Sequence, residues 1–303
     1  MSSAKTKLWV ASGPRCVWDA GRVLGESVFW SVAERAVYWV DIKEPALLRL
    51  DPKNGDQAIW PLPEMIGCCA PIAGGGLIAG LASGLHRLDC GPPGQSPVMQ
   101  MLARPDGHGP LDRFNDGKAH PDGSFWAGTM DDAEREVRGH YVRLAPDGAL
   151  TRIAGPYRVC NGPAFSADGR FAYLSDSAAQ IVHRIDLSVA EAGPEPFLRF
   201  GDGDGYPDGL TTDSAGRLWI AFWDGARVAC HDPETGDCLL SIAMPVDRPT
   251  SCAFGDDDLT TLYVSSARNP EGSVAPMAGG ALFAVEIDGA NGWPAPAYRP
   301  GMV

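Results

Sequence analysis

A turn followed by a β-rich run of residues recurs six times along the chain, and this repeat restricts the fold more than any other feature. The large apolar residues that anchor the six runs are Trp39, Ile78, Trp126, Tyr173, Trp219 and Tyr263. A period of about 40 to 50 residues is typical of propeller blades or of another array of stacked repeats. Helical periodicity is essentially absent, and 37 glycines and 26 prolines indicate many turns. The repeat therefore predicts an all-β fold, a six-bladed β-propeller.

A second strand that ends in a polar turn follows each anchor, as in residues 47–51 and 182–186. Four short strands in each copy would form sheets arranged radially around a channel, which protects the sheet edges by repetition. Residues 15–20 precede the first full copy, so we expect this N-terminal strand to pair with the last blade and close the ring. Sandwiches and barrels also contain glycine-punctuated strands, but copies that stay in phase favour the propeller. We expect one domain over residues 1–303, because closed all-β folds commonly exceed about 200 residues.

Composition excludes several classes of partner. The formal net charge is -13, and no run of Lys or Arg supplies the basic patch that nucleic acid or an anionic membrane requires. No stretch of about 18 apolar residues occurs, and residues 1–10 lack the apolar core of a secretory signal, so we expect a cytoplasmic protein. The eight cysteines contain no Cys-x-x-Cys pair, which argues against a zinc site or a disulfide framework. No sequence feature indicates an oligomeric state.

Four polar residues occupy one position of the repeat, about one strand upstream of the anchor. They are Glu26, Asn115, Asn161 and Asp208. The corresponding positions of the other two copies, near Gly67 and Cys252, are small or apolar. Because every blade of a propeller repeats the same geometry, these four side chains should lie at one end of the innermost strands. We therefore expect them to converge on the channel axis.

The chemistry of this set favours a metal ion. A carboxylate buried among apolar residues is costly unless it is paired or bound to metal, and no Lys or Arg stands at an equivalent position. Two carboxylates and amide oxygens suit one divalent cation, calcium first, with Mn²⁺, Mg²⁺, Zn²⁺ or Fe²⁺ as alternatives. The competing interpretation is that Asn161 and Asp208 only cap turns, as Asn-Gly and Asp-Gly sequences often do. Their shared phase favours the metal site.

Several motifs resemble the regucalcin (senescence marker protein) and gluconolactonase family. They are Gly-Glu-Ser at 25–27, Arg-Phe-Asn-Asp-Gly-Lys at 113–118, Ala-Gly-Thr-Met at 127–130, Asn-Gly at 161–162 and Pro-Asp-Gly at 207–209. The resemblance covers nearly the whole chain. It implies a six-bladed propeller with one axial divalent metal that hydrolyses sugar lactones to aldonic acids.

The resemblance also implies roles for individual residues. Carried over by position, the metal ligands would be Glu26, Asn161 and Asp208, and the residues that contact substrate would be Arg113, Asn115 and Met130. Asp208 would also be the catalytic residue, either as general base or by orienting the attacking water. Residues 131–140 resemble the family's lid over the channel, but Ala133 stands where some members carry a glutamate that binds substrate.

These observations favour a metal-dependent carboxylic-ester hydrolase of the gluconolactonase type. Its partner would be a small sugar lactone of the glucono-, xylono- or arabinonolactone type. Two alternatives use the same site: a calcium-binding regulatory propeller without turnover, and a hydrolase of phosphotriesters or aryl esters. Fold membership alone does not decide between these chemistries.

Overall fold

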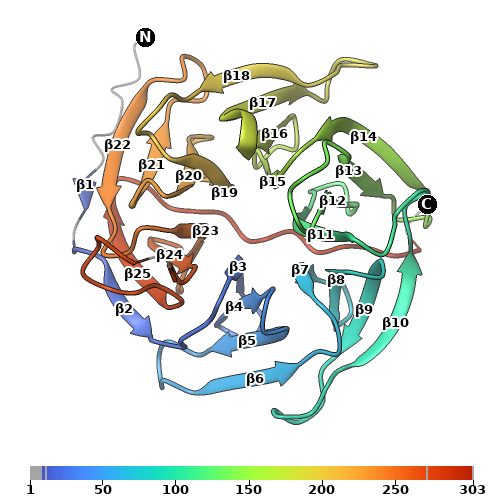
Figure 1. Ribbon diagram of the computed structural model, residues 1–303, viewed down its shortest axis with the longest axis horizontal. Coiled ribbons are helices and arrows are strands. Elements are labelled where there is room, and N and C mark those ends of the chain that lie inside the picture. Colours follow the sequence, from blue (N-terminus) through green and yellow to red (C-terminus); the bar gives the residue numbers. More distant parts are fainter. Residues whose placement is uncertain (1–8, 11, 271, 302–303) are drawn as a thin grey trace.

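The computed structural model describes residues 9–10, 12–270 and 272–301, so most of the N-terminal stretch examined for a secretory signal lies outside it. Within these ranges the strands form six sheets arranged as blades around a central axis (Figure 1). The only helical element among the described residues is the 3₁₀ turn η1 (Ser177–Ala179). The prediction of an all-β, six-bladed propeller is confirmed.

Blades 1 to 5 each contain four antiparallel strands that run in sequence order from the channel outward. In blades 1 to 3 these are β3 (Gly25–Ser31), β4 (Ala36–Asp41), β5 (Ala46–Leu50), β6 (Gln57–Pro61), β7 (Ile66–Pro71), β8 (Leu77–Leu81), β9 (Leu85–Asp89), β10 (Val98–Ala103), β11 (Asp112–Ala119), β12 (Phe125–Asp131), β13 (Gly139–Leu144) and β14 (Leu150–Tyr157). In blades 4 and 5 they are β15 (Cys160–Phe165), β16 (Phe171–Asp176), β17 (Ile181–Asp186), β18 (Glu195–Arg199), β19 (Tyr206–Thr212), β20 (Leu218–Trp223), β21 (Arg227–His231) and β22 (Cys238–Ala243).

Blade 6 joins the two ends of the chain. Its inner strands are β23 (Pro249–Gly255), β24 (Thr261–Ser266) and β25 (Leu282–Asp288), and the N-terminal strands β1 (Trp9–Val10) and β2 (Arg15–Trp18) both pair antiparallel with β25. The expected closure of the ring by the N-terminal strand is confirmed. The strand is shorter than the predicted segment, because it ends at Trp18.

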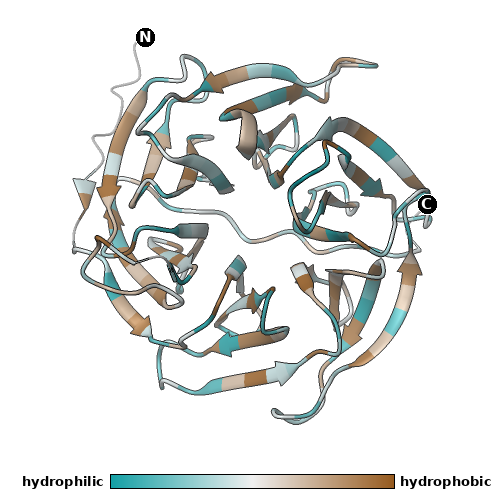
Figure 2. Cartoon of the chain, in the orientation of Figure 1, coloured by the Kyte–Doolittle hydropathy of each residue, from teal (hydrophilic) through white to brown (hydrophobic). Residues whose placement is uncertain are grey.

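The six repeat anchors form the core between the blades. All are buried, with exposed fractions between 0% for Trp219 and 4% for Trp126. Hydrophobic residues, drawn brown in Figure 2, recur in the strands of every blade. Neighbouring blades share these contacts; Trp30 of blade 1 stacks on the anchor Tyr263 of blade 6, with ring centroids 6.1 Å apart. Each large buried side chain contributes about 1.5–3 kcal/mol of hydrophobic stabilisation, so the anchors that reveal the repeat also hold the ring together.

A β-bulge interrupts every innermost strand at the same place. The pairing with the next strand shifts between Glu26 and Phe29, Ile66 and Cys68, Phe114 and Gly117, Asn161 and Ala164, Pro207 and Leu210, and Pro249 and Cys252. A bulge leaves a residue out of the ladder and changes the direction of its side chain. Asn115 and Asp208 lie within the bulge, and Glu26 and Asn161 are the last paired residues before it, so the predicted polar residues lie at or next to the bulges.

The two bulges without a site residue have their own packing reasons. A Cβ on Gly67 in blade 2 would lie 2.2 Å from the carbonyl oxygen of Phe114 in blade 3, so only glycine fits. In blade 6 the bulge holds Thr250 and Ser251, and the Thr250 hydroxyl contacts the carbonyl of Gly25 and the hydroxyl of Ser265. Blades 2 and 6, which flank blade 1, therefore contribute no residue to the predicted set.

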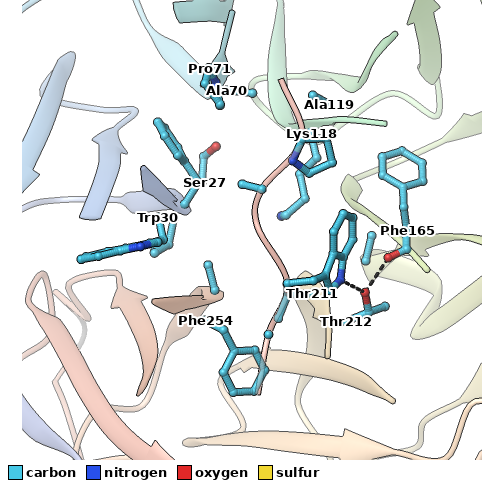
Figure 3. Close-up of a pocket in the computed structure, with 18 of the residues that line it drawn as sticks. Ser27, Trp30, Ala70, Pro71, Lys118, Ala119, Phe165, Thr211, Thr212 and Phe254 are labelled. Atoms are coloured by element: carbon cyan, nitrogen blue, oxygen red, sulfur yellow. Dashed lines mark hydrogen bonds between the residues drawn. The ribbon is translucent and has the colours of Figure 1, made fainter. Parts of the chain in front are cut away.

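The C-terminal segment, residues 290–301, crosses one end of the channel. Figure 1 shows it in red, running between the blades from β25 toward the opposite side of the ring. The Trp293 indole donates to Thr212 Oγ1 at 3.0 Å, and both residues line the pocket in Figure 3, which also contains Ser27 and Lys118. The channel is therefore covered at the end where the innermost strands finish.

All eight cysteines lie within the described residues, and each is a free thiol, as the spacing predicted. Cys68 and Cys69 are both buried in blade 2. No helix among the described residues is long and apolar enough to cross a membrane.

Candidate functional site

A cavity of about 460 Å³ opens at the other end of the channel, where the innermost strands begin. It contains all the residues predicted from sequence: Glu26, Arg113, Asn115, Met130, Asn161 and Asp208. Each of them is buried, with exposed fractions of 1% for Met130 to 5% for the two asparagines. The structure thus brings the predicted set together in one pocket, while the role of each residue stays a prediction.

The bulges position these side chains, and glycine beside them allows the blades to approach. Gly162, which follows Asn161, has φ +83°, a left-handed conformation that favours glycine. A Cβ on Gly209, which follows Asp208, would lie 2.8 Å from the Cα of Ser251 in blade 6. The Asn-Gly and Asp-Gly pairs are therefore explained by bulge geometry and close packing.

A continuous chain of hydrogen bonds fixes the polar side chains of blades 3 and 4. Arg113 Nη1 donates to Asn115 Oδ1 at 2.5 Å, and Asn115 Nδ2 donates to Asn161 Oδ1 at 2.7 Å. Asn161 Nδ2 donates in turn to Ser177 Oγ at 2.9 Å. Neither amide caps its own turn, so the turn-capping alternative does not describe Asn161. Asn161 Oδ1 accepts one hydrogen bond, which leaves its second lone pair available to a ligand.

The two carboxylates on the pocket floor lack a cationic partner. Glu26 and Asp208 are each 3% exposed, and neither forms an ion pair within the described chain. Asp208 Oδ1 is buried and has no hydrogen-bond partner in the part of the chain that the structure describes. Burial raises the pKa of both groups, and repulsion from Asp116 adds to the rise, as does the charge of Glu26 on the pKa of Asp208. Two buried negative groups close enough to repel each other are unfavourable without a bound cation.

This donor set fits a divalent cation. No three His, Cys, Asp or Glu side chains of the described chain form a cluster that would hold a metal by themselves. The candidate set instead offers two carboxylates and the Asn161 amide oxygen, all hard oxygen donors. The unpartnered Asp208 Oδ1 is the observation that supports the fit, because a buried carboxylate oxygen otherwise has a partner.

A third buried carboxylate was missed in the sequence, although it lies in a quoted motif. Asp116 is fully buried beside Asn115, and it accepts the N–H groups of Gly117 at 2.7 Å and Gly162 at 3.0 Å. It thereby joins the bulges of blades 3 and 4. Lys118 Nζ lies 4.0 Å from its carboxylate and is the nearest balancing charge. The hydrogen bond between Asp116 and Gly162, which belongs to the Asn-Gly motif 46 residues away, is visible only in the folded structure.

The pocket wall contains further residues that the repeat did not indicate. Tyr206 and Trp223 form an aromatic side, and Arg158 lies in the loop before β15. From the lid segment, Glu134 lines the pocket, whereas Ala133 does not. The carboxylate that this segment contributes to the pocket, Glu134, thus lies one residue after the position at which some family members carry a glutamate.

In the metal-free protein we expect the free energy of unfolding to increase as the pH falls from neutral toward the raised pKa values of Glu26 and Asp208. Raised folded-state pKa values mean that the folded protein binds more protons than the unfolded chain, so stability decreases as the pH rises above the unfolded pKa values. Thermal melts in chelator between about pH 8 and pH 5 measure this. Asp208→Asn should melt higher than wild type at pH 8 and reduce the pH slope. A slope identical in the two proteins would contradict the expectation.

Comparison with known proteins adds independent findings. The model of the family described as SMP-30/gluconolactonase/LRE-like region matches residues 24–268. A 6-deoxy-6-sulfogluconolactonase of Pseudomonas putida is 40% identical over 84% of this chain and 87% of its own length. An L-arabinolactonase of Azospirillum brasilense is 34% identical over 82% of this chain and 83% of its own length.

A solved structure matches the fold closely. The calcium-binding protein regucalcin of Agrobacterium tumefaciens superposes with a TM-score of 0.87 at 26% identity, covering 95% of this chain and 97% of its own. The matched family region begins just before Glu26 and extends past Asp208, so it includes every predicted site residue.

Proposed function

Because the chain belongs to the SMP-30/gluconolactonase/LRE-like family, we propose that it is a metal-dependent lactonase that hydrolyses a sugar lactone to the aldonic acid. The observation that supports this most is the buried Asp208 carboxylate, whose Oδ1 has no hydrogen-bond partner among the described residues, in a pocket that also contains Arg113 and Asn115. A carboxylate oxygen that can accept a proton therefore lines the same pocket as two side chains that can bind sugar hydroxyls. The relatives named as lactonases make sugar lactones the substrate class to test first.

Glu26, Asn161 and Asp208 would hold the cation, and we propose calcium, the metal in the description of the solved relative. When bound, such a cation supplies Lewis acidity toward the lactone carbonyl and offsets the charge of the buried carboxylates. The hydrogen bonds from Asn115 to Asn161 and from Asn161 to Ser177 hold the Asn161 amide in one orientation. The site is therefore organised by this chain before substrate enters.

The other residues bind and orient the substrate. Asp208 Oδ1 would accept the proton of the attacking water. Arg113 donates through Nε to Asp132 and through Nη1 to Asn115, which leaves Nη2 without a bond among the described residues and available to a substrate hydroxyl. Met130 is 1% exposed and forms an apolar part of the wall. These contacts would fix the ring while water attacks its carbonyl.

The presence of Arg113 on the pocket wall favours a sugar lactone over a phosphotriester or aryl ester. A hydrolase of bulky apolar esters would need an apolar mouth, and a purely regulatory calcium site would need no neighbouring group for sugar hydroxyls. The pocket is lined by the polar groups of Arg113 and Asn115 from blade 3 and by the aromatic side chains of Tyr206 and Trp223 from blade 5. A pocket lined by both polar groups and aromatic side chains suits a sugar ring, which presents hydroxyls at its edge and C–H groups on its face.

A pH-indicator assay on glucono-, xylono- and arabinonolactones tests the proposed function. We expect acid release from at least one lactone, loss of that activity in chelator, and its return when calcium is added. A fully metal-loaded protein that releases acid from none of them would contradict the proposal. Turnover that survives complete removal of metal would contradict the metal dependence alone.

A further inference from the structure

We propose that the lactone bound by this pocket carries a tetrahedral oxyanion, a sulfonate or a phosphate, at its end remote from the carbonyl, and that Arg158 binds this group. The inference rests on the proposed lactonase function and adds the class of substrate. Arg158 lines the same cavity as Asp208 but is exposed, whereas Asp208 on the floor is 3% exposed. A substituent that reaches Arg158 must therefore extend away from the reacting end toward the rim.

The charge of Arg158 is not neutralised by a carboxylate in contact. Its Nη1 donates to the backbone carbonyl of Glu134 at 2.8 Å and to that of Arg135 at 3.5 Å. Asp176 lies close enough to feel the charge, but the two form no ion pair within 4 Å. The other arginine of the pocket, Arg113, contacts the carboxylate of Asp132 at 2.6 Å. Among the described residues, Arg158 is thus the arginine of the pocket wall that has no carboxylate within ion-pair distance.

The lid orients Arg158 without cancelling that charge. Asp131 accepts the N–H groups of Arg135 at 2.9 Å and Glu136 at 3.2 Å through its side chain, which closes the lid backbone into a tight turn. Glu134 at the tip has φ 56°. This turn presents the two carbonyls to one side of the guanidinium. The remaining N–H groups form the fork that matches two oxygens of a sulfonate or phosphate.

The size of the cavity and its other charges are compatible with such a substrate. A volume of about 460 Å³ falls within the range of pockets for ligands larger than a simple sugar ring. The negative groups that line it are Glu26 and Asp208 on the floor, which the proposed cation balances, and Glu134 on the rim. Glu134 forms no ion pair with Arg158 in the described chain, so its carboxylate is available to accept a neighbouring hydroxyl. The rim then offers one acceptor for hydroxyls and one cation for the oxyanion.

The test compares gluconolactone with its 6-sulfonated and 6-phosphorylated forms in the metal-loaded wild type, Arg158→Met and a matched control, Arg152→Met. Arg152 is exposed on β14 of the same blade and does not line the pocket. In wild type we expect kcat/KM to be at least about tenfold higher for an oxyanion-bearing lactone, the size of a charge-assisted hydrogen bond. Arg158→Met should remove this preference and change kcat/KM for the neutral lactone by less than about threefold. The sulfonated and phosphorylated arms show which oxyanion fits.

Calorimetric titration of the 6-sulfonated and 6-phosphorylated aldonic acids gives a readout independent of turnover. We expect at least about tenfold weaker binding to Arg158→Met than to wild type or Arg152→Met. No preference for either charged lactone, or an equal loss on neutral and charged lactones, would overturn the inference and leave the lactonase proposal intact. If no lactone is hydrolysed, the lactonase proposal fails, and the titration still decides whether Arg158 binds an oxyanion.

Discussion

Replacing Asp208 by asparagine is expected to lower kcat for lactone hydrolysis by about 10²–10⁴-fold, the usual contribution of a general base. The substitution keeps the size of the side chain but removes its ability to take a proton. Asp208 Oδ1 is the buried carboxylate oxygen of the pocket without a hydrogen-bond partner within the described chain, so it is free to accept a proton. Steady-state kinetics on the best lactone at saturating calcium measure the change in kcat and KM.

Calcium titration of the same variant separates proton transfer from metal binding. Asp106→Asn is the matched control, because Asp106 is exposed in a turn between β10 and β11 and does not line the pocket. Full calcium occupancy with a large loss of kcat supports a general base. Near wild-type turnover with bound calcium would show that Asp208 only holds the metal or orients the water. Loss of calcium binding in Asp208→Asn would show that the main role of Asp208 is to bind the metal.

The sequence predicted the architecture because the repeat records which residues pack between blades. Trp39, Trp126 and Trp219 recur at one position since each fills the same kind of interblade core, and all three are buried. The phase of Glu26 and Asp208 relative to these anchors then identified the end of the channel where the pocket lies. The local sequence pattern was sufficient to predict the position of a residue wherever equivalent residues in different blades have the same structural surroundings.

Features that depend on contacts between unlike segments were not predictable in this way. Asp116 holds two bulges together through Gly162, a residue of the next blade. Glu134 rather than Ala133 reaches the pocket because the lid turns tightly around Asp131. Each of these contacts occurs once in the ring, so the repeated sequence pattern does not reveal it. They lie at the pocket, where the sequences of the blades differ most.

The C-terminal segment is another contact that occurs only once, and its position predicts a large effect on stability. It bonds to blades 5 and 6 at one end, through Asn291 to Ser214 and Gly292 to Leu259. At the other end Tyr298 bonds to Pro71 and Ala73 of blade 2 through its backbone, and its ring packs in the core of blades 2 and 3. The segment therefore ties opposite sides of the ring across the channel, in addition to the closure by β2.

Tyr298→Ala is expected to lower the free energy of unfolding by about 3–5 kcal/mol, as for other large aromatic residues removed from a core. Tyr298 is 3% exposed, and its loss would leave a cavity beside Phe114, on the strand that carries Asn115. Tyr298→Phe is the control, because it removes only a hydroxyl that lies 3.3 Å from the Ala145 carbonyl, and should cost about 1 kcal/mol or less. Urea denaturation measures both variants. If the alanine variant unfolds within about 1 kcal/mol of the phenylalanine variant, the ring is held by the β2 closure and the C-terminal tie is dispensable.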